Sequence, residues 1–485
     1  GTEVASQPWS TASGAETLLH HPATAHAQHW AATLAAWLDH CPGDWLSWLY
    51  LARLRDGAPD AAAAAAALQH ACQLEPIAGE SLHWLGLWRL QGGDHSGAVQ
   101  AFAQLVDHRP LLNALPGRCG DARAHLAAVE THYAELGDPA SRLASSIAMA
   151  SLYVDHLSPE QVAERHRQLC APIEANLTAS SGFANDRDPH RPLRIGLVSG
   201  DFHRQHPVNL FMLPLLEQLD RHQFPVVVFH TGSMHDEYTV RARQAAASWI
   251  ECNQLDDHAL QQRIVTEQID LLLDLAGHTS SHRLGVFALR AAPVQATFLG
   301  YPHSTGLTSI DWLIGDAVVS PAEHAHLFSE GIAQLPGSVF CWCPIDNYPL
   351  PPPRDPAAPL VFGSFNNIMK LSERTIRLWA ALLYDIPDAQ LLLKAPSLAE
   401  RSVVERFETL FAAQGINPDR LLFEGPSELG QMMQRYGAID IALDPTPYNG
   451  GTTTLQALWM GVPVISLRGG NFVSRMGASF LTALG

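Results

Sequence analysis

Three prolines at a constant interval constrain the fold of this chain more than any other feature of its sequence. Pro42, Pro76 and Pro110 follow one another at intervals of 34 residues. A fixed interval of this length indicates a repeated structural unit, which sets the architecture before any site can be interpreted. The equivalent positions before the prolines hold Trp30, Leu34 and Trp37, then Trp48, Leu51, Ala52, Arg55, Ala64, Leu68 and Ala71, then Leu82, Leu85, Gly86, Arg89, Ala98, Phe102 and Leu105.

The repeat predicts pairs of antiparallel helices. Small residues such as Ala52 and Gly86 let two helices approach closely, and each proline ends the second helix of a pair. This is the tetratricopeptide pattern, and we expect such helical repeats over residues 21–177, after a tail at 1–20. An alanine-rich helical bundle is the alternative, but it does not explain three prolines in register. Stacked repeats form grooves that hold peptides, so a protein or peptide acceptor in the repeat groove is the expected partner.

The charge balance and the cysteines exclude several classes of protein. Lys and Arg total 30 against 48 Asp and Glu, which gives a net charge of −18, so nucleic acid is not an expected partner. No signal pattern and no apolar run of 18 residues is present, so we predict a cytoplasmic protein without a membrane segment. The seven scattered cysteines favour reduced thiols. Cys341 and Cys343 lack the second pair that a zinc site needs.

Beyond residue 191 the pattern changes to short apolar runs that alternate with helical stretches. Such runs are typical of buried parallel strands, and ligands bind at the carboxyl ends of these strands, in the cleft between two lobes. Because the chain stops at Gly485 directly after a helical stretch, we expect the last lobe to be incomplete. The predicted segments are a linker at 178–191, a first α/β lobe at 192–348, a proline-rich linker at 349–359 and a second lobe at 360–485. The predicted strands are 193–198, 225–229, 271–274, 294–298, 312–314, 360–365, 390–393, 421–423, 439–443 and 462–465.

The strongest candidate site is the segment at 440–464, in which a strand, a Pro/Gly loop, a helix and a second strand follow one another. The helix is expected to begin near Gly451, Thr452 or Thr453. Free backbone N–H groups, the positive end of the helix and threonine hydroxyls together suit a diphosphate. The alternative is that the glycines only form the turn and that Thr452 caps the helix.

Lys370 ends a second polar loop, which follows the strand predicted at 360–365. A leaving nucleoside diphosphate gains negative charge as its glycosidic bond breaks, and a fixed ammonium group stabilises that charge. Asn366 and Asn367 could donate hydrogen bonds beside it. A surface lysine at the start of a helix is the alternative interpretation.

Three loops of the first lobe also follow predicted strands. His206 lies where the first loop would overhang the cleft, and it could accept a proton from an incoming hydroxyl or hold the reacting groups in place. His278, Tyr301 and Ser304, on the other two loops, are candidates to line a sugar pocket. Because the chain has 25 histidines, an ordinary structural role is the alternative for each of them. The Gly and Pro content of these loops also suits tight turns.

A metal is not expected in the chemistry of this chain. Many enzymes that use sugar nucleotides bind the diphosphate through a metal held by an Asp-x-Asp pair. The only such spacing here, from Asp186 to Asp188, lies in the linker before the first strand of the lobe. A mechanism without a metal is therefore favoured, with no cofactor besides the sugar-nucleotide substrate.

Five segments in the same order resemble the O-GlcNAc transferase and SPINDLY family, over about residues 45–485. The resemblance implies tetratricopeptide repeats followed by a GT-B fold with two Rossmann-like lobes. It also implies an inverting single displacement, in which a Ser or Thr hydroxyl of a protein attacks the sugar of UDP-GlcNAc and UDP departs. The segments are RIGLVSGDF…HP at 194–207, AGHT at 276–279, APVQATFLGYP at 292–302, GSFNNIMK at 363–370 and PYNGGTTT…LWMGVP at 447–463.

The resemblance also implies roles for single residues. Lys370 matches the lysine on the donor diphosphate, and His206 matches a histidine proposed as a base or as a positioning group. Gln456 departs from the family, whose members carry Asp or Glu there to hold the ribose, and an amide bonds a ribose without charge assistance. The other donor-binding positions that match are Asn367, Gly451, Thr452 and Thr453, with Gly451 where some relatives carry histidine.

Two alternatives remain open at this point. The AGHT and PYxGxTTT motifs look closer to the SPINDLY branch, whose plant members transfer fucose from GDP-fucose to Ser or Thr. A peptide-binding scaffold with an inactive transferase region is the other alternative, for which Gln456 is a mild indication. Repeats of this type sometimes dimerise, so a homodimer is a further alternative to a monomer.

Overall fold

The computed structural model describes residues 119–136, 141–175 and 177–485, except 204–205, 280–281, 345, 349, 352–353 and 356, together with the isolated positions 35, 38, 51, 67 and 117. The chain divides into two compact units, Gly1–Leu115 and Pro116–Gly485. All the helices and strands named below belong to the second unit. The prolines that define the predicted repeat, at positions 42, 76 and 110, lie outside the described residues.

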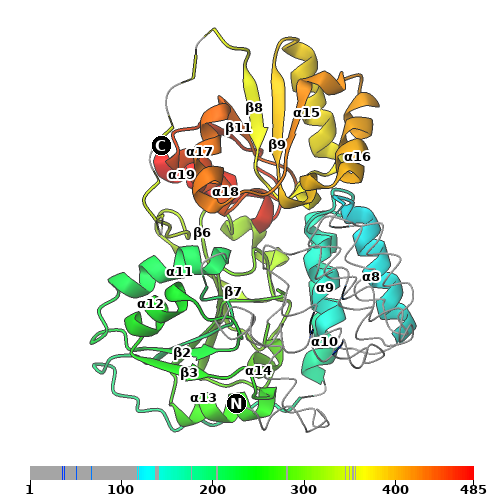
Figure 1. Ribbon diagram of the computed structural model, residues 1–485. Coiled ribbons are helices and arrows are strands. Elements are labelled where there is room, and N and C mark those ends of the chain that lie inside the picture. Colours follow the sequence, from blue (N-terminus) through cyan, green and yellow to red (C-terminus); the bar gives the residue numbers. More distant parts are fainter. Residues whose placement is uncertain are drawn as a thin grey trace. The chain divides into compact units, whose positions relative to one another are not determined.

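Three helices precede the first sheet of this unit, as the helical pattern over 121–175 predicts. Helix α9 packs against both of the others. Its buried side is made of small residues, because Ala144 and Ala148 are 1% and 0% exposed, and this allows the helix axes to approach closely. The three helices are α8 (Ala122–Leu136), α9 (Ser141–Ser151) and α10 (Pro159–Ala175), drawn side by side in Figure 1.

The first α/β lobe is built on a seven-stranded parallel sheet with the order β3-β2-β1-β4-β5-β6-β7. The order reverses between β1 and β4, and the loops after these two strands border the crevice in which such sheets bind ligands. The strands are β1 (Ile195–Ser199), β2 (Val226–His230), β3 (Ser248–Glu251), β4 (Leu271–Asp274), β5 (Val294–Phe298), β6 (Trp312–Asp316) and β7 (Gly331–Leu335). The helices are α11 (Pro207–Gln218), α12 (Glu237–Ala245), α13 (Asp257–Thr266) and α14 (Leu284–Ala288), and a 3₁₀ turn covers Ala322–Leu327.

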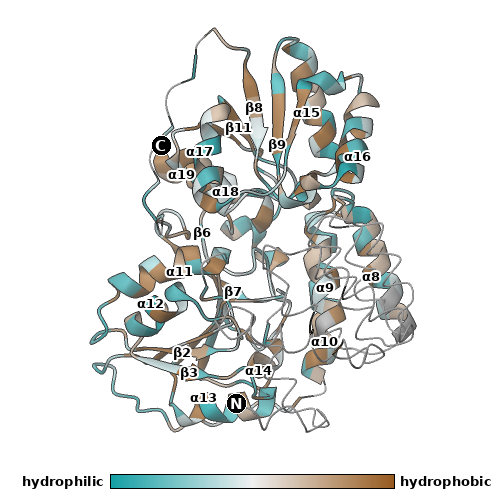
Figure 2. Cartoon of the chain, viewed as in Figure 1, coloured by the Kyte–Doolittle hydropathy of each residue, from teal (hydrophilic) through white to brown (hydrophobic). Residues whose placement is uncertain are grey.

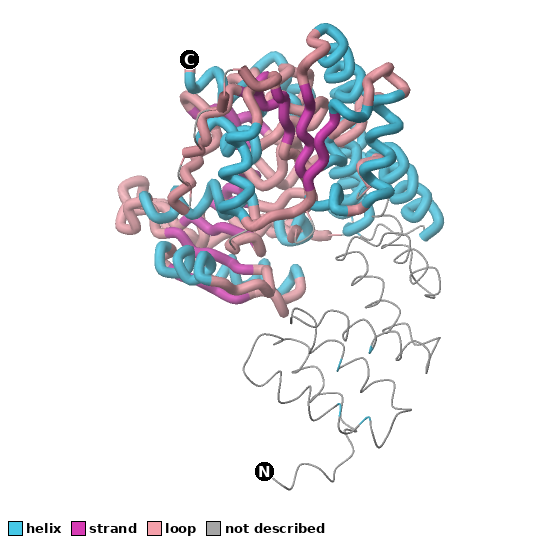
Figure 3. The backbone as a smooth tube through the Cα atoms, turned by 45° about the horizontal axis from the view of Figure 1, so that its top comes forward, coloured by secondary structure: helices cyan, strands magenta, loops and turns pink. Residues whose placement is uncertain are grey.

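The second lobe is built on a five-stranded parallel sheet with the order β10-β9-β8-β11-β12. Its order reverses between β8 and β11. Figure 3 shows the strands of the two lobes as separate groups surrounded by helices. The strands are β8 (Val361–Ser364), β9 (Gln390–Lys394), β10 (Leu421–Glu424), β11 (Ile441–Leu443) and β12 (Val464–Ile465). The helices are α15 (Glu373–Asp385), α16 (Arg401–Ala412), α17 (Leu429–Arg435), α18 (Thr452–Trp459) and α19 (Met476–Leu484), with 3₁₀ turns at Ile368–Lys370, Pro396–Ala399, Pro418–Arg420, Tyr436–Ala438 and Phe472–Ser474.

Each apolar run that the sequence indicates corresponds to a strand of the structure; 271–274 and 294–298 coincide with β4 and β5, and the other runs have shifted ends. Figure 2 shows apolar residues along the strands and mixed colours along α15 and α16, which have one polar side. Two strands were not predicted, β3 and β7, with the sequences SWIE and GIAQL. Both are edge strands of the first sheet and partly exposed. An edge strand contacts one neighbour only, so it can fold without the continuous apolar run that identifies a central strand.

The last helix of the chain, α19, packs against the first lobe rather than only against the second. The Phe480 ring lies edge-on to the Phe340 ring at 4.8 Å between centroids. The Ser479 hydroxyl donates a 2.7 Å hydrogen bond to Asp316 Oδ2, at the end of β6. One hydrophobic core therefore runs through the three helices α8 to α10, the first sheet and α19.

Candidate active site

The reversal points of the two sheets bring the predicted loops of each lobe together. The loop after β8 carries Asn366 and Asn367 and leads to Lys370, and the loop after the neighbouring strand β11 leads to the start of α18. In the first lobe, the loop after β1 leads to His206 and the loop after β4 leads to His278. Parallel strands that are neighbours place these loops at the same edge of the sheet, so a ligand site is expected there.

Asp444 organises the loop before α18. It is 6% exposed, and its Oδ1 accepts hydrogen bonds from Gly450 N and, at 3.3 Å, from the Thr454 hydroxyl. Its Oδ2 accepts the Ser466 hydroxyl at 2.6 Å. Burial raises the pKa of Asp444 to about 6, against the opposing effect of these bonds and of Lys370. Asp444 was not among the residues predicted from the sequence, although a carboxylate between a buried strand and a Gly-Gly turn was a usable signal.

The first turn of α18 is open to an anion. Gly451 occupies the N-cap position and provides no side-chain cap. Thr452 is the first helical residue and is half-buried. Thr453 is bound to the neighbouring loop, because its hydroxyl donates a 2.8 Å hydrogen bond to Asn366 Oδ1. The predicted alternative, a helix capped by Thr452, does not occur. Backbone N–H groups of this turn are therefore left for a ligand.

Lys370 lies beside the loop that leads to this turn. Its Nζ donates a 3.0 Å hydrogen bond to Asn449 O and lies 4.3 Å from the centre of the Tyr448 ring. Tyr448 in turn stacks on Tyr153, which follows α9, at 4.5 Å between centroids. Burial lowers the pKa of Lys370 to about 8, although the charge of Asp444 acts in the opposite direction. An ammonium group with so little water around it interacts strongly with an added anion.

The resemblance implies two further donor-binding residues, Asn367 and Gln456. Asn367 is exposed, and its Oδ1 accepts a 3.0 Å hydrogen bond from Met369 N, so it caps the 3₁₀ turn that ends at Lys370. Gln456 lies on α18 and is 8% exposed. Of the two asparagines predicted beside Lys370, Asn366 is the one that contacts α18, because its Oδ1 accepts the Thr453 hydroxyl.

His206 caps α11 and belongs to the other lobe. Its Nδ1 accepts a 3.3 Å hydrogen bond from Val208 N, so in the neutral ring the proton is assigned to Nε2. Nε2 lies 3.6 Å from Asp201 Oδ1. Burial, with a smaller effect from His203, lowers the pKa of His206 to about 4, and burial raises the pKa of Asp201 to about 6. A neutral ring with its proton on Nε2 can donate a hydrogen bond there but cannot accept a proton there.

His278, Tyr301 and Ser304 do not line an open pocket, contrary to the prediction. They are 3%, 3% and 1% exposed. The Tyr301 hydroxyl lies 2.6 Å from Nε2 of His166 on α10, and the two ring nitrogens of His278 bond to Ser145 Oγ and to a backbone oxygen. The polar atoms of His278 and Tyr301 are used inside the protein, where they hold α9 and α10 against the first lobe.

Ser304 and Gly277 also belong to this closely packed region. Ser304 donates a 2.7 Å hydrogen bond to the buried carboxylate of Glu330, so its hydroxyl is also occupied. Gly277 has φ of +52°, and an added Cβ would lie 2.1 Å from the Cβ of Tyr301. The AGHT motif therefore follows from close packing at Gly277 and from the buried hydrogen bonds of His278.

Two buried asparagines, neither of them predicted as a site residue, have side-chain polar atoms without a partner among the described residues. Neither Oδ1 nor Nδ2 of Asn209, on α11, has a partner among the described residues, and the residue is 0% exposed. Asn449 Oδ1 is also buried without a partner within the described part of the chain. Such atoms are uncommon in folded proteins, and an unfilled ligand site is one explanation. A lone asparagine in a sequence carries no signal for this.

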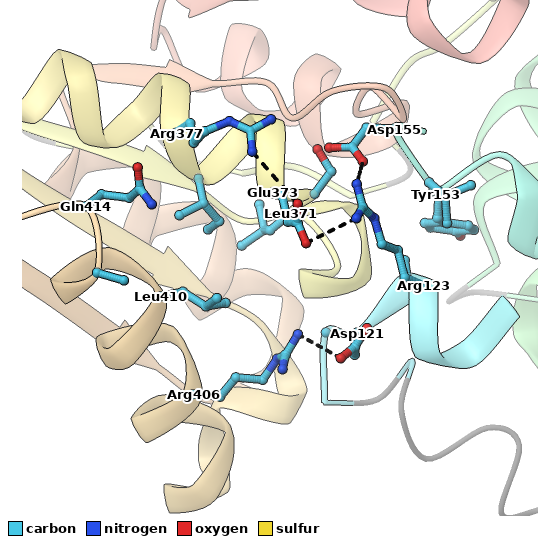
Figure 4. A pocket seen from close by; sticks show the side chains of 16 residues that line it. Asp121, Arg123, Tyr153, Asp155, Leu371, Glu373, Arg377, Arg406, Leu410 and Gln414 are labelled. Atoms are coloured by element: carbon cyan, nitrogen blue, oxygen red, sulfur yellow. Dashed lines mark hydrogen bonds and ion pairs between the residues drawn. The ribbon is translucent and has the colours of Figure 1, made fainter. Parts of the chain in front are cut away.

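A cavity of ≈ 380 Å³ separates α8 from α15 and α16 (Figure 4). Its charged side chains are paired with one another: Arg123 with Asp155 at 2.8 Å and with Glu373 at 3.3 Å, and Arg406 with Asp121 at 3.1 Å. Its walls include no residue of α18. Because the arginines of this cavity are already paired with carboxylates, the cavity is better explained as a junction between elements than as a diphosphate site.

The Asp-x-Asp spacing of the sequence, from Asp186 to Asp188, lies among the residues that the structure describes. Asp186 Oδ1 accepts a 3.0 Å hydrogen bond from Asp188 N, which is a local turn in the linker. Cys341 and Cys343 are free and exposed. Over the same described residues, no helix is at once long enough and apolar enough to cross a bilayer.

The chain is similar in sequence to known proteins. The "Probable UDP-N-acetylglucosamine–peptide N-acetylglucosaminyltransferase SPINDLY" of Solanum lycopersicum is 32% identical over 72% of this chain and 38% of its own length. The protein of the same name from Arabidopsis thaliana is 30% identical over 72% of this chain and 39% of its own length. The chain thus spans about two fifths of the length of these relatives.

The solved structure of an O-GlcNAc transferase mutant from Thermobaculum terrenum is 27% identical, with a TM-score of 0.73, and the match covers 98% of this chain and 86% of that one. The family model described as glycosyl transferase family 41 matches residues 141–343 and 346–485. These residues include both sheets and every loop of the candidate site. The protein belongs to glycosyl transferase family 41 and has its GT-B-like fold.

Proposed function

We propose that the protein transfers N-acetylglucosamine from UDP-GlcNAc to Ser or Thr hydroxyls of a protein or peptide, with inversion and without a metal. Membership of glycosyl transferase family 41 supports a glycosyltransferase, and the names of the two SPINDLY relatives support this donor and a peptide acceptor. In the proposed step, the acceptor oxygen forms a bond to the anomeric carbon. The bond from that carbon to the phosphate oxygen breaks, UDP leaves with its electron pair, and the hydroxyl proton passes to solvent or to a base.

One observation carries the proposal: a half-buried lysine and an uncapped helix start lie at the reversal point of the same sheet. The Lys370 ammonium and the first N–H groups of α18 both suit the oxygens of a diphosphate. Each interaction strengthens as negative charge builds up on the leaving group, so it accelerates the transfer instead of only binding the donor. Asp444 keeps the intervening loop in shape, since it bonds to Gly450 N and to two hydroxyls.

The first lobe supplies the groups for the sugar and the acceptor in this proposal. His206, neutral and with its proton on Nε2, acts as a donor that positions the acceptor or the sugar, rather than as the base. Asn209 begins the same helix, α11, and its unpartnered amide suits a sugar hydroxyl or an acetamide group. A bound sugar would satisfy both of its polar atoms.

A donor panel tests the proposal. The chain is incubated with UDP-GlcNAc, UDP-glucose, UDP-galactose or GDP-fucose and a Ser/Thr peptide library, and peptide modification and released nucleotide are measured. UDP-GlcNAc should support transfer, and Lys370→Ala should lower kcat by roughly 10²–10³-fold. Arg221→Ala, which removes an exposed cation from the other lobe, should leave kcat unchanged. Absence of UDP binding by calorimetry would exclude the proposal.

The same panel separates the two alternatives. Transfer from GDP-fucose, with GDP a better competitor than UDP, would identify an O-fucosyltransferase, which the motifs at 276–279 and 447–454 favour. Peptide binding without turnover, unchanged in Lys370→Ala, would identify a scaffold. A peptide groove in the repeats, a homodimer and a cytoplasmic location remain predictions from the sequence.

A further inference from the structure

Three side chains that commonly bind metals meet at the carboxyl ends of β2 and β3, in the first lobe. His230 is the last residue of β2, Glu251 is the last residue of β3, and His235 lies on the loop after β2. His230 and Glu251 are direct partners in the parallel ladder, so their side chains leave the same edge of the sheet. One possible ligand atom from each of the three residues lies within 4.8 Å of the others. We propose that His230 and His235 bind a divalent transition-metal cation of the zinc class, and that Glu251 holds the second ring nitrogen of His230 in place.

The buried histidine gives an independent reason for a cation. The side chain of His230 is 0% exposed. Its Nδ1 lies 3.0 Å from Glu251 Oε2, and its Nε2 is buried without a partner among the described residues. The hydrogen bond to Glu251 leaves Nε2 unsatisfied, whereas a cation on Nε2 satisfies it and keeps Nδ1–H on the carboxylate. A carboxylate that holds the second ring nitrogen is the usual support of a metal-bound histidine.

The surroundings leave room for a cation and hold Glu251 in place. A cavity of ≈ 450 Å³ adjoins the cluster and is lined by His235, Glu251, Arg243 and Asn253, among others. Trp249 Nε1, at 2.9 Å, and the Arg243 guanidinium both bond to Oε1 of Glu251, and Oε2 bonds to His230 Nδ1. Imidazole nitrogens with open positions for water are typical of zinc and of its neighbours in the first transition row. The charge of Arg243 opposes the cation, so we expect weaker binding than in an unopposed site.

A cation here would fix the loop after β2 to the end of β3. This loop lies against the segment that follows β1, because Thr231 N donates a 3.0 Å hydrogen bond to Ser199 O. Gly232 approaches the same segment so closely that an added Cβ would lie 2.3 Å from Gly200 O. The cation would therefore stabilise the loops at this edge of the sheet. The transfer step does not require it.

Metal titration of variants tests this site. Tag-free protein is stripped with a chelator and titrated with Zn²⁺ by calorimetry, and with Co²⁺ by its visible absorption. His235→Ala and Glu251→Gln are chosen because both side chains are exposed, so neither change should unfold the chain. Each should weaken the binding of one Zn²⁺ equivalent by roughly 10–100-fold. His258→Ala, an exposed histidine on α13, should bind as the unaltered protein does.

A stability readout makes the test independent of activity. Zn²⁺ should raise the Tm of the unaltered protein and of His258→Ala, because a ligand of the folded state stabilises it. It should raise the Tm of His235→Ala much less. Since the chain has 25 histidines, only the difference between variants identifies this site. Equal Zn²⁺ affinities and equal Tm shifts in His235→Ala and the unaltered protein would overturn the proposal.

Discussion

At the scale of single residues, the candidate active site depends on a buried carboxylate and a half-buried lysine that face the same loop. Burial disfavours both charges, and it moves the pKa of Lys370 to about 8 and that of Asp444 to about 6. Asp444 accepts three hydrogen bonds, from Gly450 N and from the hydroxyls of Thr454 and Ser466, whereas the Lys370 ammonium has one backbone oxygen and the face of Tyr448. A diphosphate therefore gains more from Lys370 than from an ordinary surface lysine.

The binding of UDP should depend on pH through Lys370. In the free protein this group loses its proton as the pH rises through about 8, so we expect the affinity for UDP to fall between about pH 7 and about pH 10. Calorimetric titrations with UDP at constant ionic strength measure this. Lys370→Arg remains charged over the whole range, so its affinity should change little with pH. Identical pH profiles for the two proteins would assign the titration to another group.

Replacement of Asp444 should affect stability and binding together. In Asp444→Asn one acceptor oxygen becomes a donor, so at least one of the bonds to Gly450 N and the two hydroxyls is lost in a buried place. We expect the free energy of unfolding to decrease by about 1–3 kcal/mol, together with weaker UDP binding. Urea denaturation and calorimetry measure the two effects. Asp388→Asn, an exposed site before β9, should change neither.

At the scale of elements, the segment between α9 and α10 connects the helices to the second lobe. Asp155 accepts hydrogen bonds from Arg123, at 2.8 Å, and from Arg374 N, at 2.9 Å, in the first turn of α15. Burial alone would raise the pKa of Asp155, but these bonds lower it overall. The carboxylate therefore joins α8 to the start of α15, on one side of the cavity in Figure 4.

The contribution of Asp155 to stability should disappear in acid. Its pKa is lower in the folded than in the unfolded chain, so its contribution is complete above about pH 4 and is lost as the pH falls through the folded value. Asp155→Ala should lower the free energy of unfolding at neutral pH by about 1–2 kcal/mol, by analogy with the loss of a helix cap. The difference between the two proteins, followed by urea denaturation, should shrink with acidification. A difference that grows in acid would contradict the assignment.

In a double-mutant cycle, the coupling of Asp155 to Arg123 should be below about 1 kcal/mol, because the arginine is half exposed. Most of the effect of Asp155→Ala should therefore come from the backbone N–H of Arg374. Arg123→Ala alone should have a small effect on urea denaturation. A large coupling would show that the ion pair itself is the main contact.

At the scale of the whole described unit, α19 ties the end of the chain to the first lobe. Phe480 is 3% exposed and packs on Phe340, while Ser479 bonds to Asp316 at the end of β6. Unfolding of either lobe would expose this contact. The lobes are therefore expected to unfold as one cooperative unit.

Phe480→Ala should weaken this connection. Loss of a buried phenylalanine costs about 3–5 kcal/mol, which is large compared with the stability of a domain. We expect a lower Tm and, if the lobes separate, two transitions in differential scanning calorimetry where the unaltered protein shows one. Leu484→Ala, at an exposed position of the same helix, is the matched control and should shift the Tm little. An unchanged Tm in Phe480→Ala would mean that α19 does not couple the lobes.

The sequence by itself determined the parallel strands and the loops that carry the donor site. Short apolar runs identified the central strands because a strand covered on both faces must be apolar throughout its length. Lys370 and the start of α18 could be placed because each follows such a strand, and neighbouring parallel strands put their loops at one edge. The same reasoning could not find β3 and β7, whose edge positions relax that requirement.

Only the tertiary structure decided what each polar side chain contacts. His278 and Tyr301 follow strands just as Lys370 does, yet they bond to Ser145 on α9 and His166 on α10, which lie more than a hundred residues away in the chain. Ser304 is likewise buried, against Glu330. Contacts at such separations depend on how layers pack, and no local spacing encodes them. For the same reason the unpartnered amide of Asn209 and the meeting of His230, His235 and Glu251 were visible only in the folded chain.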